Sequence, residues 1–102
     1  MSLPKKVKIG GFWWKVKING DIAEEGRCFG STHYKTQTLY LDPDTTETHQ
    51  KQVLLHEILH AIVWQVGLEK RFTDKDIISE ENVIGSLSHT LYQVLKENKL
   101  DF

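Results

Sequence analysis

The sequence predicts a single α+β domain in which a small antiparallel sheet of three to four strands packs against two main helices. Polar and apolar residues alternate near the N-terminus, which is typical of strands, and apolar residues recur at helical spacing in two later segments. The chain has 102 residues, 39% of them apolar, which is enough for one hydrophobic core. We therefore assign residues 1–102 to one domain.

A β-hairpin is predicted at residues 5–18, KKVKIGGFWWKVKI, because period-two alternation continues on both sides of a Gly-Gly pair. A tight turn at Gly10 and Gly11 sets Ile9 opposite Phe12. Side chains directly opposite each other share a face of the sheet. The expected core-facing residues are Val7, Ile9, Phe12 and Trp14, and the expected outward residues are Lys6, Lys8, Trp13 and Lys15.

Two further strands and a first helix follow the hairpin. Residues 27–34 and 37–41 are predicted strands because aromatic and β-branched residues are frequent in them. The segment DPD then favours a turn. We expect the helix to begin with Asp44 as its N-cap, and Gly67 is a suitable C-terminal stop.

A second helix is expected to run to about Asn98. It begins at either Thr73 or Ser79, because both residues suit an N-cap and both precede acids that favour a helix N-terminus. Its apolar positions recur at helical spacing, so this helix should be amphipathic. These positions are Val83, Ile84, Leu87, Leu91, Val94 and Leu95.

Composition excludes several classes of protein. The 13 Lys and Arg residues nearly balance the 14 Asp and Glu residues, so we expect no nucleic-acid partner. Cys28 is the only cysteine, which leaves histidine and carboxylate as the ligands of any metal. The sequence has neither a signal-like apolar run nor the ~20 apolar residues that span a bilayer. A cytoplasmic protein without membrane contact is therefore expected.

Two histidines four residues apart, His56 and His60, interrupt the apolar segment VLLHEILHAI. On a helix such residues share one face, about 6 Å apart along the axis, so both imidazoles can bind one zinc ion. Glu57 lies one step round the helix, where its carboxylate can act as a general base on a zinc-bound water. The alternative is an ordinary helix whose histidines form only local hydrogen bonds. The apolar residues expected to face the core are Leu55, Ile58, Leu59, Ile62 and Val66.

A third metal ligand is expected from the second helix, where Glu80 and Glu81 compete. At about 100° per residue, Glu80 projects at the centre of the apolar stripe that Val83, Ile84, Leu87 and Leu91 form on the second helix, and Glu81 falls to one side of it. An acid in a helix interface is costly unless it is paired or coordinated, which favours Glu80, with Glu81 as the close alternative. His49 lies about 10.5 Å before His56 along the helix, too far for the same ion. Asp74, Asp76 and His89 are weaker candidates.

The segment VLLHEILHAI is similar to the HExxH signature of zincin metallopeptidases. The wider pattern, TLYLDP, then HEILHAIVWQVGL, then SEENVIGSLSHTLYQVLKEN, resembles small phage- and prophage-encoded zincin-like proteins related to the ImmA/IrrE metallopeptidases. By that resemblance His56 and His60 would be zinc ligands and Glu57 the catalytic base. The family's Glu-Ala-Asn motif is here EEN, and matching Asn82 to its Asn makes Glu80 the third ligand.

We therefore expect a zinc-dependent metallopeptidase that cleaves a peptide bond in a protein substrate, such as a phage or host regulator. The alternative is a catalytically silent metal-binding module that regulates a partner protein. An exposed sheet edge is expected to hold the substrate as an added strand. The developing oxyanion also needs a hydrogen-bond donor. Candidates for this donor are His33, Tyr34, Tyr40 and Tyr92.

Overall fold

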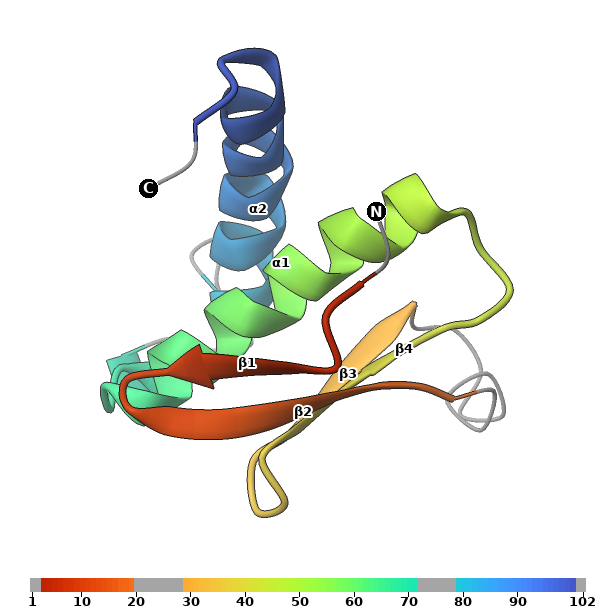
Figure 1. Ribbon diagram of the computed structural model, residues 1–102. Helices are drawn as coiled ribbons and strands as arrows, with labels where there is room; N and C mark the ends of the chain where they lie inside the picture. Colours follow the sequence, from red (N-terminus) through yellow and green to blue (C-terminus); the bar gives the residue numbers. More distant parts are fainter. Residues whose placement is uncertain (1–2, 20–28, 72–78, 101–102) are drawn as a thin grey trace.

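The computed structural model describes residues 3–19, 29–71 and 79–100, and these form an α+β fold of one sheet and two α-helices (Figure 1). The predicted fold class is confirmed. The elements along the described chain are β1 (Lys6–Ile9), β2 (Phe12–Ile18), β3 (Gly30–His33), β4 (Thr38–Leu41), α1 (Glu47–Gln65), the short 3-10 helix η2 (Glu69–Arg71) and α2 (Glu80–Glu97).

The sheet has the strand order β1-β2-β4-β3 and is mixed. The β1–β2 and β3–β4 pairs are antiparallel, but β2 and β4 run parallel, so the prediction of a wholly antiparallel sheet was wrong at this pair. Strand β4 buries Thr38, Leu39 and Leu41, whereas no residue of β3 is fully buried. The more apolar strand takes the interior position. Strand β4 therefore lies between β2 and β3. Strand β3 runs opposite to β2, and β4 runs opposite to β3, so β4 is parallel to β2.

The β1–β2 hairpin has the predicted register, with Ile9 opposite Phe12 across the turn. Gly10 and Gly11 have φ values of 56° and 89°, a conformation that glycine adopts without steric cost. Ile9 and Trp14 are buried as expected, but Phe12 is 55% exposed, so its assignment to the core was wrong. Phe12 directly follows the turn, at the end of the sheet, where few neighbouring residues can cover it.

Helix α1 begins one residue after Thr46, whose side-chain oxygen accepts a hydrogen bond from the His49 N–H. The prediction of Asp44 as the N-cap was wrong. The Asp44 N–H instead donates to the Asp42 carboxylate at 2.9 Å, which holds residues 42–44 in a turn before the helix. At the other end Gly67 has a φ of 77°, and the predicted stop is confirmed.

Helix α2 begins after Ser79, one of the two predicted N-caps. The Ser79 hydroxyl accepts a hydrogen bond from the Asn82 N–H at 3.2 Å. The alternative start at Thr73 lies outside the described residues. Neither α1 nor α2 is both long and apolar enough to cross a membrane, a finding limited to the described parts of the chain.

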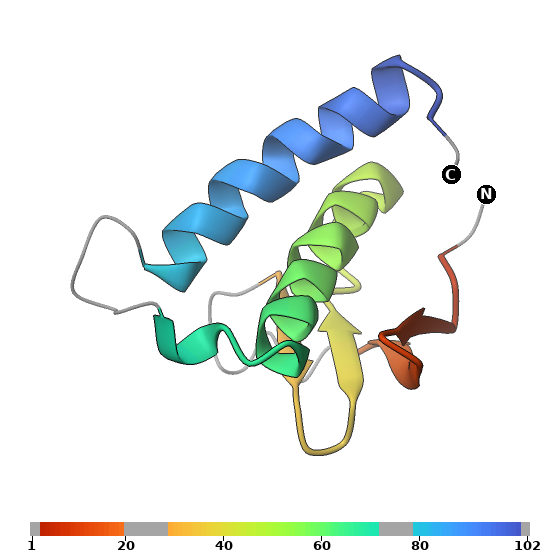
Figure 2. The ribbon, with the colours of Figure 1, turned by 90° about the vertical axis from the view of Figure 1, so that its left-hand side faces the viewer.

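Helix α1 packs across one face of the sheet, and α2 packs on α1 (Figure 2). The core residues that α1 contributes are Leu54 and Ala61. The set of α1 residues predicted to face the core was only partly right: Ile58 packs against the core, but Ile62 and Val66 are exposed. As a result, the α1 face that carries Glu57 lies against the sheet. The buried hydrophobic core consists of Ile9, Trp14, Leu39, Leu41, Leu54 and Ala61.

Candidate metal centre

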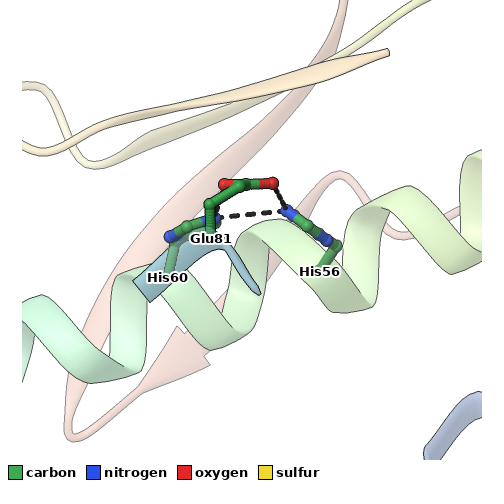
Figure 3. Close-up of side chains that lie close together, drawn as sticks. All are labelled: His56, His60 and Glu81. Atoms are coloured by element: carbon green, nitrogen blue, oxygen red, sulfur yellow. Dashed lines mark hydrogen bonds and ion pairs between the residues drawn. The ribbon is translucent and has the colours of Figure 1, made fainter. Parts of the chain in front are cut away.

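Three side chains from α1 and the first turn of α2 bring their polar atoms together (Figure 3). The Nε2 atoms of His56 and His60 lie 3.2 Å apart. The two carboxylate oxygens of Glu81 lie 2.9 Å from His56 Nε2 and 2.8 Å from His60 Nε2. The ligand atoms of the three residues all fall within 4.8 Å of one another. The i, i+4 spacing on α1 aligns the histidines, and the N-cap at Ser79 sets where Glu81 enters.

These separations suit a small metal ion. Zinc bound tetrahedrally at ~2.0 to 2.1 Å places neighbouring ligand atoms about 3.3 Å apart. The observed separations of 2.8 to 3.2 Å are slightly shorter, because the side chains contact each other directly. Two imidazoles and one carboxylate also form a donor set that zinc accepts, with a further coordination position left over. The residues present therefore fit a zinc ion.

Glu80 and Glu81 contact different nitrogens of His60. The Glu80 carboxylate lies 2.5 Å from Nδ1, on the side of the ring away from the shared Nε2 atoms. The Glu80 side chain is 17% exposed, whereas that of Glu81 is 68% exposed and reaches over both histidines. A carboxylate on the outer nitrogen of a metal-binding histidine fixes the ring's orientation and its tautomer. The geometry thus favours Glu81 as the third ligand and Glu80 as the residue that orients His60.

Glu57 is buried, with 7% of its surface exposed, in the face of α1 that packs on the sheet. The Thr32 hydroxyl on β3 donates a hydrogen bond to Glu57 Oε1 at 2.6 Å. Burial raises the pKa of the Glu57 carboxyl, while the Thr32 hydrogen bond and the two neighbouring histidines act in the opposite direction. A carboxylate with a raised pKa holds a proton more readily than an exposed one, as a general base requires.

A glycine on β3 permits this contact between α1 and the sheet. A Cβ atom on Gly30 would lie 2.5 Å from a methyl carbon of Val53 and 3.1 Å from Glu57 Cγ. Both distances are shorter than ordinary packing allows, so α1 can approach this end of β3 only over a glycine. Sequence reasoning identified neither Gly30 nor Thr32 as part of the site. A lone glycine in a predicted strand is the one signal that pointed to such a close approach.

The candidate ligands and Glu57 line one cleft of about 630 Å³ between β3, α1 and α2. Tyr34 also lines it, and burial together with the nearby carboxylates raises the pKa of its phenol. Tyr34 therefore keeps its proton and can donate a hydrogen bond into the cleft. The other predicted oxyanion donors do not line the cleft: His33 packs edge-on against Tyr40, and Lys96 lies over the Tyr92 ring.

The remaining histidines and acids considered from the sequence lie outside the ligand group. His49 lines the cleft, but its Nδ1 pairs with the Thr45 hydroxyl at 2.6 Å. His89 also lines the cleft, from an exposed position on α2. Asp74 and Asp76 lie outside the described residues.

No family model, curated protein or solved structure matches this chain. The resemblance to the ImmA/IrrE metallopeptidases therefore stays a prediction from the sequence. The chemistry of the site rests on its geometry.

Proposed function

We propose that the protein is a zinc-dependent metallopeptidase that hydrolyses a peptide bond in a protein or peptide substrate. One observation carries the proposal: His56, His60 and Glu81 converge in the same cleft that holds the buried carboxylate of Glu57. The HExxH spacing and the resemblance to ImmA/IrrE metallopeptidases support it. A cytoplasmic location and a phage or host regulator as substrate remain predictions from the sequence.

In this proposal His56, His60 and Glu81 would hold the zinc ion, and Glu80 fixes the His60 ring through Nδ1. When bound, zinc supplies an activated water and polarises the carbonyl of the scissile bond. Glu57 accepts a proton from the attacking water and later delivers it to the leaving amine. The Tyr34 phenol donates a hydrogen bond to the oxyanion that develops on the substrate.

The substrate is proposed to lie along β3, the edge strand on the cleft side of the sheet. The Asp42 N–H donates to the Phe29 carbonyl at 2.8 Å, so these two residues form a hydrogen-bonded pair beside β4. Alternation along an antiparallel pair then directs the N–H and C=O groups of Gly30 and Thr32 away from β4. An extended peptide can pair with these groups as an added strand and pass over the cleft.

The proposal predicts zinc-dependent cleavage of peptides. The protein, loaded with zinc, is incubated with a pool of peptides from a digested bacterial proteome, and new termini are identified by mass spectrometry. We expect cleavage at a restricted set of sequences, its loss after chelation and its return when zinc is restored. Restoring the ion controls for damage by the chelator. Cleavage that persists without metal, or no cleavage by the zinc-loaded protein, would contradict the proposal.

A further inference from the structure

Thr32 lies in the middle of β3, opposite Leu39 of β4, with its side chain on the face of the sheet that α1 covers. Its hydroxyl oxygen is 2.6 Å from Glu57 Oε1 and 3.3 Å from the Glu57 main-chain carbonyl oxygen. A hydroxyl has one proton to donate, and the shorter distance assigns that proton to the carboxylate. Thr32 therefore fixes one oxygen of the proposed general base.

The contact leaves the second oxygen of the carboxylate available. Among the described residues, Glu57 Oε2 has no hydrogen-bond partner, and Glu57 lines the cleft together with the candidate zinc ligands. A carboxylate held at one oxygen can rotate little about its last bond. The hydrogen bond from Thr32 thus presents the free oxygen in a defined direction before any substrate arrives.

The main chain of Thr32 can pair with the substrate strand. Its N–H and C=O groups point away from β4, to the edge of β3 that no described strand covers, where the proposed function places the substrate strand. One residue thus contacts the general base through its side chain and the substrate through its backbone. A peptide that pairs with Thr32 is placed in register with the carboxylate that the same residue holds.

We propose that Thr32 is a positioning residue that orients the Glu57 carboxylate relative to the substrate strand on β3. The inference rests on the proposed function and deepens it, because it explains how base and substrate are aligned. It requires the hydroxyl of Thr32 and not merely the volume of its side chain. Thr32→Ser keeps the hydroxyl, whereas Thr32→Val keeps the shape and removes the donor.

The test compares these two variants with the wild type, all loaded with zinc, on one peptide that the wild type cleaves. We expect Thr32→Val to lower kcat about 10- to 100-fold, the scale of a misplaced reacting group, with KM and bound zinc unchanged. Thr32→Ser should stay close to wild type. Thr38→Val is the matched control, because it removes a buried hydroxyl on β4 whose one partner among the described residues is the Thr36 carbonyl.

Crystal structures of the zinc-loaded wild type and Thr32→Val provide a readout that does not depend on activity. We expect the Glu57 carboxylate to turn away from its wild-type direction when the hydroxyl is missing. The inference would be overturned if the Glu57 carboxylate does not move or if Thr32→Val keeps the wild-type kcat. It would also be overturned if Thr32→Ser and Thr38→Val lose as much kcat as Thr32→Val. If the wild type cleaves nothing, the proposed function is overturned together with this role. If the wild type cleaves and Thr32→Val does so equally, only the inference on Thr32 fails.

Discussion

Glu57→Gln is expected to slow peptide cleavage strongly while the protein keeps its zinc. Glutamine has the shape of glutamate, and its amide oxygen can still accept the hydrogen bond from the Thr32 hydroxyl. It cannot accept a proton from the attacking water. General base catalysis contributes about 10² to 10⁴ in rate, so kcat should fall by that factor. Cleavage kinetics and zinc content are measured on the same preparation.

The variant should not be less stable than the wild type. Burial raises the pKa of the Glu57 carboxyl, which means that its charged form is disfavoured inside the protein, and a neutral amide avoids this cost. Glu47→Gln is the matched control, because Glu47 is exposed in the first turn of α1 and, within the described parts of the chain, pairs with Lys51 alone. Unchanged cleavage by Glu57→Gln would contradict the proposed mechanism and favour a module that binds metal without hydrolysis.

Replacing Glu81 by alanine is expected to weaken zinc binding much more than replacing Glu80. Glu81 contacts both Nε2 atoms of the histidine pair, so its loss removes one of the proposed ligands. Glu80 contacts the outer nitrogen of His60 and not the Nε2 atoms, and changes at such supporting residues typically cost about 10- to 100-fold in metal affinity. Zinc affinity is measured by competition with a chromophoric chelator.

The two variants control for each other, because both remove one carboxylate from the first turn of α2. Glu81 is also 68% exposed, so its truncation leaves no buried space behind. A larger loss of affinity in Glu80→Ala than in Glu81→Ala would contradict the arrangement of ligands proposed here. That result would instead support the choice of Glu80 made from the sequence.

Local geometry explains which features the sequence predicted. Residues four apart on a helix share a face in any fold, so the approach of His56 to His60 required no knowledge of the tertiary structure. The register of the first hairpin was equally local, because the turn at Gly10 and Gly11 determines which residues oppose each other.

Features that depend on packing between distant segments were not predicted. Helix α1 is apolar on several sides, so periodicity did not reveal that the face with Leu54 and Ala61 would meet the sheet. The Thr32–Glu57 hydrogen bond joins residues 25 positions apart. No local pattern marks such a pair before α1 is placed on β3.

The preference between Glu80 and Glu81 depended on which side of α2 meets α1. The apolar positions of α2 were expected to form that contact; of these, Ile84 is buried, but Leu87 is 58% exposed. Ile84 and Ser88 are the buried residues of α2, and the Ser88 hydroxyl lies 3.4 Å from His56 Nδ1. Glu81 lies on the same side of the helix as Ser88, two turns earlier, and therefore extends over the histidines.

Metal analysis of the purified protein is the most direct test of whether His56, His60 and Glu81 bind zinc. Wild type and His60→Ala are saturated with zinc, freed of excess metal by gel filtration, and measured for metal content per chain. We expect about one zinc ion per wild-type chain and a loss of stoichiometric zinc in His60→Ala, because that change removes one of the proposed ligands. A wild type without bound zinc, or a His60→Ala variant that retains it in full, would contradict the proposed zinc site.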